Sequence, residues 1–288
     1  MNCMGSNLLE IEGATNWLSN SDNIFKVRVI NDYLKQNSCN AESKNFSELA
    51  VEAWLNDGDL EFEKLEKFYV QMNKECQAEK VFDLIINSNV SLTNFIKNEF
   101  GKSTEHHIQF EDIDLPDDVI AGTIFPDEPI LNDEGQNGII LNFDNSYLDN
   151  ASNLSIVLTA AHEFVHIRLG YLYIKGELLN VYPDYTDIND AFITYYDDKS
   201  NANRTALDQS MHDVYDDFLD EITDSVFNYA TNNNITGATR DYCEKMVLGA
   251  HQNTNAFQGL TPEQQTEYST IIVNENEGKA NAKGSKCE

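Results

Sequence analysis

Basic side chains are scarce in this chain. Its 288 residues include 19 lysines and arginines against 49 aspartates and glutamates, which gives a formal net charge of -30 at pH 7. A protein that binds the phosphate backbone of nucleic acids, or that docks electrostatically on an anionic membrane, needs a basic face. The composition therefore argues against both kinds of partner, and it favours solubility and an attraction for cations.

Long apolar runs are also missing. No stretch approaches the roughly 20 residues that cross a bilayer as a helix, so we expect no membrane span. The segment from Met1 to Gly5 has no basic residues followed by an apolar run, so we expect no secretory signal. Two localisations stay open, the cytoplasm and export by a non-classical route. A larger parent protein or a delivery system is compatible with either.

Cysteine is sparse and scattered. Five cysteines, an odd number, occur without a C-x-x-C pair: Cys3, Cys39, Cys76, Cys243 and Cys287. We therefore expect unpaired thiols, and neither a disulfide framework nor a cysteine zinc knuckle. By contrast, 41% of the residues are hydrophobic and 10% are aromatic, which at this length is enough for a folded protein with a full core.

Helical periodicity dominates the first part of the chain. One apolar stripe follows the capping candidate Ser21, and a second ends at Asp57-Gly58. The stripes consist of Ile24, Val27, Ile30 and Leu34, and of Phe46, Leu49, Ala53 and Trp54. The helix rhythm changes near residue 70. We therefore expect a helical N-terminal segment over residues 1–70, acting as an adaptor or linker, and a second domain over residues 71–288.

The second domain mixes helical and β-rich segments. Helices are expected over 75–87 and 92–100, and β-rich runs over 107–110, 119–125 and 138–143 predict a sheet of about three strands. A helix from about 152 to 173 and a polar, turn-rich segment over 175–203 come next. A long helix over 205–229, a helix over 240–248 and a polar tail complete the chain. The expected fold class is helix-rich α+β.

An H-E-x-x-H motif runs from His162 to His166 on a predicted helix. Residues i and i+4 lie one turn apart on the same face, so both imidazoles can reach one ion. Glu163 lies about 100° around the helix from His162, where it suits a general base that activates a zinc-bound water better than a third ligand. Apolar residues on both sides of the motif predict that this helix is buried. Zn²⁺ is therefore the expected cofactor.

The third ligand has to come from another segment. Leu169 and Leu172 occupy the positions where the short-spaced metzincin pattern has glycine and histidine, which excludes that pattern. Glu177 has no evident register with the motif. His212, on the expected long helix, is the better candidate, and Asp216 one turn later could orient a ligand imidazole. Glu221 lies about 180° from His212 on that helix.

Several segments of the chain resemble one family. The run from Glu75 to the C-terminal tail resembles an uncharacterised group of bacterial zincin-like metallopeptidase modules. The matching segments are Glu75-Cys76, the strand end 140–142, the segment 161–166, Met211-His212-Asp213 and the segment 248–257. The resemblance implies His162, His166 and His212 as metal ligands and Glu163 as the base. It also implies a C-terminal enzyme module of a kind often carried by larger exported or toxin-like proteins. At position 251 that group usually has a small or apolar residue, whereas this chain has histidine.

The function expected from these residues is zinc-dependent peptide-bond hydrolysis by a zincin-like metallopeptidase. In this fold a small sheet packs on the active-site helix, and a second helix delivers His212. The strand over 139–143 is the expected aligner of a peptide or protein substrate. Tyr215, Tyr242 and His251 are candidate oxyanion donors. Two alternatives stay open: a non-catalytic, zinc-stabilised interaction module, and a delivered toxin-like effector that uses the same site.

Other polar residues carry weaker signals. His106-His107 predict a surface position. The segment 184–198 holds five aspartates, and their spacing favours a solvated acidic loop over a calcium site. Because this segment joins the two histidine-bearing helices, we expect it to attract substrates with Lys or Arg near the cleaved bond. The aspartates are Asp184, Asp187, Asp190, Asp197 and Asp198.

Overall fold

The computed structural model describes residues 68–100, 108–116, 119–126 and 138–287 without gaps, together with residues 13–19 and single or paired positions between 11 and 55. The chain divides into two compact units, Met1–Glu66 and Lys67–Glu288. The division precedes strand β1 (Phe68–Gln71), so all of this strand belongs to the larger unit.

The smaller unit has an apolar cluster of its own. Its described part includes helix α2 (Ala14–Leu18), and the rings of Trp17 and Trp54 stack with their centroids 5.2 Å apart. Ile30 and Leu34, from the first predicted stripe, are buried in this cluster. Ser21, Ile24, Phe46, Leu49, Ala53 and the Asp57-Gly58 stop lie outside the described residues.

The larger unit contains a mixed sheet. Its strands β1, β2 (Ile108–Ile113), β3 (Ala121–Ile124) and β4 (Ile139–Asp144) stand in the order β1-β2-β4-β3. β1, β2 and β4 run parallel, whereas β3 pairs antiparallel with β4. The helix-rich α+β class is therefore confirmed, with four strands where about three were expected. β4 is an interior strand, so the prediction that it would align a substrate is wrong; β3 stands at the edge.

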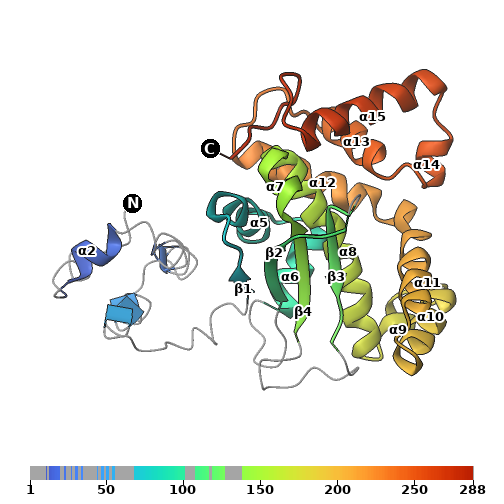
Figure 1. The fold of residues 1–288 in the computed structure, drawn as a ribbon, viewed down its shortest axis with the longest axis horizontal. Helices are drawn as coiled ribbons and strands as arrows, with labels where there is room; N and C mark the ends of the chain where they lie inside the picture. The colour runs from blue at the N-terminus through green and yellow to red at the C-terminus, as the bar shows by residue number, and fades with distance from the viewer. Residues whose placement is uncertain are drawn as a thin grey trace. The chain divides into compact units, whose positions relative to one another are not determined.

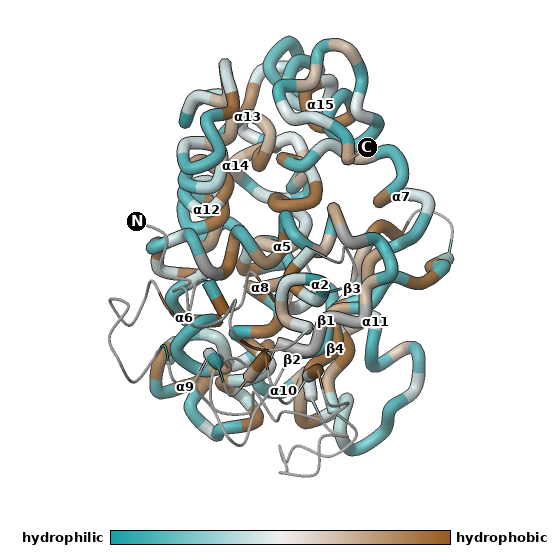
Figure 2. The backbone as a smooth tube through the Cα atoms, turned by 90° about the vertical axis from the view of Figure 1, so that its left-hand side faces the viewer, coloured by the Kyte–Doolittle hydropathy of each residue, from teal (hydrophilic) through white to brown (hydrophobic). Residues whose placement is uncertain are grey.

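Helix α8 (Asn153–Ile174) is the central element of this unit (Figure 1). The Ser152 side chain caps it by accepting a hydrogen bond from the Ser155 N–H. Helices α5 (Glu75–Asn87), α6 (Ser91–Glu99) and α12 (Leu219–Asn232) pack against α8, and β3 contacts it from the sheet. Because neighbours surround it, α8 is apolar on nearly all sides, as its largely brown trace in Figure 2 shows. Its expected bounds agree with the structure.

The segment expected to be polar and turn-rich is helical. It contains α9 (Leu178–Val181), α10 (Thr186–Asp197) and the start of α11 (Asn201–His212). The single long helix expected over 205–229 is also wrong, since α11 and α12 are separated by a 3₁₀ turn, η3 (Tyr215–Asp217). In this turn the backbone N–H groups of Asp217 and Phe218 donate to carbonyls three residues earlier, and the side chains of Tyr215 and Asp216 bond to distant backbone groups.

The tail after α13 (Arg240–Ala250) folds as well. It forms α14 (Asn255–Gln258) and α15 (Pro262–Asn276), which lie with α13 at the top of Figure 1. Helix α15 begins with a capping box between Thr261 and Gln264 and has Pro262 in its first turn. A polar composition therefore hid a helix whose start signal is present in the sequence. Helix α7 (Asn145–Asn150) joins β4 to α8.

A disulfide joins the two ends of the larger unit. Cys76 in the first turn of α5 is bonded to Cys287, 211 residues away, with the Cα atoms 5.7 Å apart. The expectation of unpaired thiols is therefore wrong for this pair, because partners so distant in sequence leave no local spacing signal. Cys243 is a free, buried thiol. Cys3 and Cys39 lie outside the described residues.

Helix length and polarity bear on the membrane prediction. In the part of the chain that the structure describes, no helix is both long and apolar enough to cross a membrane.

Candidate metal centre

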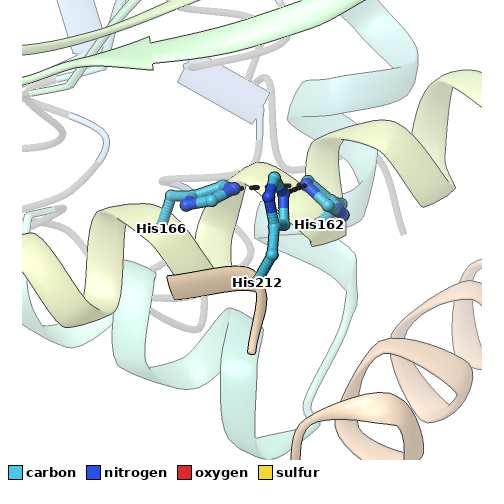
Figure 3. Close-up of side chains that lie close together, drawn as sticks. All are labelled: His162, His166 and His212. Carbon is cyan, nitrogen blue, oxygen red and sulfur yellow. Dashed lines mark hydrogen bonds between the residues drawn. The ribbon is translucent and has the colours of Figure 1, made fainter. Parts of the chain in front are cut away.

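Three imidazoles converge between α8 and α11. His162 and His166 lie one turn apart on α8, and His212 is the last residue of α11. Figure 3 shows the three rings pointing at one another. The Nε2 atom of His162 lies 3.2 Å from that of His166 and 3.3 Å from that of His212. The structure thus brings together the three residues that the sequence singled out as ligands.

These separations fit a shared metal ion. Nitrogens bound tetrahedrally at about 2.0–2.1 Å from one ion stand about 3.3 Å from each other. The two Nε2 separations match this value, and one nitrogen from each ring lies within 4.8 Å of the others. Three neutral imidazoles suit zinc, copper, nickel or iron. The three histidines could therefore hold a metal ion.

The second nitrogen of each ring has a partner outside the cluster. His162 Nδ1 lies 2.9 Å from His251 Nε2, and His166 Nδ1 lies 3.5 Å from the Met211 sulfur. His212 Nδ1 lies 3.5 Å from a carboxylate oxygen of Asp208, one turn earlier on α11. Each imidazole therefore keeps its Nε2 for the shared centre, while its Nδ1 fixes the ring orientation.

Burial keeps the α8 imidazoles uncharged. It lowers the pKa of His162 and of His166 well below the usual value, and the neighbouring imidazoles lower both further. Burial also lowers the pKa of His251 to about 4. Because a metal binds the neutral ring, this environment favours the form of the side chains that can act as ligands.

Glu163 is buried beside the histidines. Burial is the largest influence on its carboxyl group, and together with Asp208 it raises the pKa of Glu163 to about 7, against the opposing hydrogen bond from Thr123. The Thr123 hydroxyl, on the edge strand, donates to Glu163 Oε2 at 2.7 Å. A carboxyl group with a pKa near the working pH can both take up and release a proton.

Tyr215 contacts both the ring and the backbone of His162. Its ring stacks on His162 with the centroids 4.5 Å apart, and its hydroxyl donates to the His162 backbone carbonyl at 2.8 Å. Tyr242 donates to Glu275, and His251 Nδ1 lies 2.7 Å from the Val247 carbonyl oxygen. The three groups considered as oxyanion donors therefore bond elsewhere.

A cleft of about 690 Å³ opens over the cluster. Residues 119–125, which include the whole edge strand, line it together with the histidines and Glu163. Apart from histidine, the charged residues among its described lining are Glu163, Arg204 and Asp208. None of the five aspartates of 184–198 lines it, and α10 contributes only Tyr195. The expected acidic wall beside the site is therefore absent from the described lining.

Other acidic residues considered for the site have different places. Asp216 accepts hydrogen bonds from the backbone N–H groups of Asn255 and Ala256, so the prediction that it orients a ligand imidazole is wrong. Glu177 is exposed at the start of α9, and Glu221 pairs with Arg168 at 2.9 Å. His106 and His107 lie outside the described residues.

Sequence reasoning missed the partners of the functional groups. Thr123, Asp208 and Met211 contact Glu163, His212 and His166, and the sequence analysis assigned none of these contacts. Asp208 alone had a local signal, because it precedes His212 by one helical turn. The contact between His251 and His162 spans 89 residues and needs the folded structure.

Comparison with protein-family models, with curated proteins and with solved structures finds no match to this chain. The site therefore has to be interpreted from its own geometry.

Proposed function

We propose that the chain is a zinc-dependent peptidase of the H-E-x-x-H type with a zincin-like fold. One observation carries the proposal: a buried carboxyl group with a pKa of about 7, that of Glu163, lines the same cleft as three converging imidazoles. His162, His166 and His212 would hold the ion. When bound, zinc lowers the pKa of a coordinated water to about 7 and polarises a substrate carbonyl.

Glu163 acts as the general base in this proposal. Its carboxylate takes a proton from the attacking water and then gives it to the leaving amine, which suits a group with a pKa near neutrality. Thr123 donates to Oε2 of Glu163, so Oε1 stays available for the proton transfer, and the hydrogen bond holds the carboxylate toward the cleft. Burial excludes bulk water and strengthens the interaction of the carboxylate with developing charge.

The edge strand is the proposed substrate aligner. Among the described strands, β3 pairs with β4 alone, and its residues line the cleft throughout. An extended peptide could add to its outer edge through backbone hydrogen bonds, which places the chain to be cut above the histidines. The mixed sheet over the motif helix and the histidine from a later helix also support a zincin-like arrangement.

The main rival is a zinc-stabilised interaction module. Structural zinc sites are usually closed by four protein ligands, whereas catalytic sites have three and an open position. Three histidines beside a cleft therefore favour catalysis. A delivered toxin-like effector would use the same chemistry and differ only in its substrate.

The test combines zinc content with turnover. The zinc-loaded full chain is incubated with a peptide library, cleavage is mapped by mass spectrometry, and zinc is quantified in the same samples. We expect Glu163→Gln to keep one zinc per chain and to lose cleavage by two orders of magnitude or more, about 10²–10⁴-fold. Glu177→Gln, an exposed change outside the cleft, is the matched control. A wild-type chain that binds one zinc and cuts no peptide would instead support the interaction module.

A further inference from the structure

A chain of three hydrogen-bonding groups leads from the backbone of α13 to the cluster. It runs from the Val247 carbonyl to the ring of His251 and from there to the ring of His162, with distances of 2.7 and 2.9 Å. A carbonyl oxygen can only accept, so the first bond requires a proton on His251 Nδ1. In the neutral ring, His251 Nε2 is then an acceptor, and His162 Nδ1 must donate to it.

This polarity determines the chemistry at the other end of His162. A neutral imidazole carries one proton, so a proton on Nδ1 leaves Nε2 with a free lone pair. His162 Nε2 is the atom that lies 3.2 and 3.3 Å from the Nε2 atoms of His166 and His212. The opposite tautomer would put a proton on the atom that faces the shared centre, and that ring could not bind a metal.

We propose that His251 is a positioning residue that sets the tautomer and orientation of His162 for metal binding. The inference deepens the proposed function and rests on it for the role of the metal. The His251 ring that accepts from His162 is neutral, so His251 orients His162 without placing a negative charge beside the ion. A carboxylate in the same place would orient the ring and also offset part of the charge of the metal.

The surroundings of His251 are built to hold the ring. It is the C-cap residue that follows α13, it is 6% exposed, and its carbonyl accepts a hydrogen bond from the Thr254 hydroxyl at 2.7 Å. Asp216 fixes the next turn by accepting from the backbone of Asn255 and Ala256. A Cβ on Gly249 would stand 2.3 Å from the Tyr268 carbonyl oxygen, so only glycine lets α13 approach α15 this closely here.

The other two ligand candidates have weaker partners. His166 Nδ1 faces a thioether, which is a weak acceptor, and His212 Nδ1 lies 3.5 Å from a carboxylate that is 57% exposed. Only His162 is held by a buried acceptor that is itself oriented by a backbone carbonyl. We therefore expect His251 to affect metal binding more than Asp208 does.

The first experiment reads the tautomer without metal. The ¹⁵N shifts of histidine are measured by NMR on the chelator-treated full chain at pH 7.5. We expect a protonated Nδ1 and an unprotonated Nε2 on His162. His251→Phe keeps a planar aromatic ring but removes the acceptor, so His162 should lose this preference. A wild-type His162 with its proton on Nε2 would overturn the proposal.

The second experiment measures zinc affinity by competition with a chromophoric chelator. His251→Phe should weaken binding by about 10–100-fold, as loss of an orienting partner does elsewhere. His251→Gln supplies both an acceptor and a donor and should recover most of this loss. Asp208→Asn is the matched control for the exposed partner, with a smaller effect. Unchanged zinc affinity in a folded His251→Phe protein would contradict the inference. If that variant does not fold, the tautomer of His162 in the wild type and the zinc affinity of His251→Gln provide the test.

Both measurements are independent of turnover. A chain with the expected tautomer and affinities that cuts no peptide would keep the role of His251 and reject the peptidase. A chain that cuts peptides with the opposite tautomer on His162 would do the reverse.

Discussion

The hydroxyl of Thr123 donates to the carboxylate of Glu163, so the edge strand and the motif helix are joined at the proposed general base. The two residues lie 40 positions apart and line the same cleft. A substrate strand added to β3 would therefore pair with the strand that contains Thr123, whose hydroxyl orients Glu163.

Thr123→Val tests this contact. The Thr123 hydroxyl favours the charged form of Glu163 and so lowers the pKa of that carboxyl group. Loss of the hydroxyl should therefore raise the pKa of Glu163 above about 7. The acid limb of the pH profile of kcat/KM should move to higher pH, and activity at low pH should fall about tenfold for each pH unit that the limb moves. Thr123→Ser, which keeps the hydroxyl, should leave the profile in place. If the acid limb stays in place in the valine variant, the group that titrates there is not Glu163.

The third histidine can be tested by metal binding alone. His212→Ala leaves two imidazoles one turn apart, and we expect zinc affinity to fall by at least two orders of magnitude, because one of three ligands is lost. Isothermal titration calorimetry on the full chain would measure it. Glu177→Gln serves as the control and should bind as the wild type does. Equal affinities for His212→Ala and wild type would remove His212 from the ligand set.

The metal-free protein should lose stability in mild acid. Burial lowers the pKa of His251 to about 4, and that of His162 and His166 well below the usual value of 6.5. As the pH falls through about 6.5, the unfolded chain protonates these three imidazoles and the folded chain does not, which lowers the free energy of unfolding down to about pH 4. Glu163, with its pKa raised to about 7, takes up a proton in the folded chain and offsets the effect of one of the three histidines. Each histidine contributes up to about 1.4 kcal/mol per pH unit.

Urea unfolding in the presence of a chelator, at pH 7.5, 6.5 and 5.5, would measure this loss. His162→Gln removes one of the groups and should show a shallower dependence than the wild type. Parallel curves for the two proteins would show that these imidazoles do not couple to folding.

The disulfide should contribute strongly to stability. Cys76–Cys287 closes a loop of 211 residues, for which loss of chain entropy in the unfolded state predicts about 5 kcal/mol, whereas measured disulfides commonly contribute about 2–4 kcal/mol. We expect reduction to lower the free energy of unfolding by an amount in this range. The double variant Cys76→Ser/Cys287→Ser should be as unstable as the reduced protein and insensitive to reductant. Peptide mapping without reductant would verify the pairing, and a wild type indifferent to reductant would contradict it.

The sequence predicts the site better than the fold around it. The motif from His162 to His166 and its apolar flanks place two imidazoles on one face of a buried helix, and helical geometry alone requires this. The choice of His212 needed only one more imidazole on a nearby apolar helix. These are local patterns, which a single sequence displays.

Non-local contacts explain the errors. Apolar residues keep their helical spacing from Leu207 through Met211 to Phe218, so periodicity could not reveal the break at η3. At the break the Tyr215 side chain bonds to His162, 53 residues earlier, a contact that no local pattern displays. The edge position of β3 likewise depends on strand pairing, and the bond of Cys76 depends on a partner at the far end of the unit.

The N-terminus of α8 bonds to residues near position 286, more than 120 positions later in the chain. The backbone N–H groups of Ser152 and Asn153 donate to the carbonyls of Glu275 and Ser285, and Ser152 pairs with Lys286 in a β-bridge. The helix that carries His162 and His166 can therefore acquire its finished N-terminus only after the residues around 286 have left the ribosome. A chain interrupted before residue 285 would keep the side-chain cap of Ser152 on the motif helix, but it would lack the Ser285 carbonyl that accepts from the N–H of Asn153.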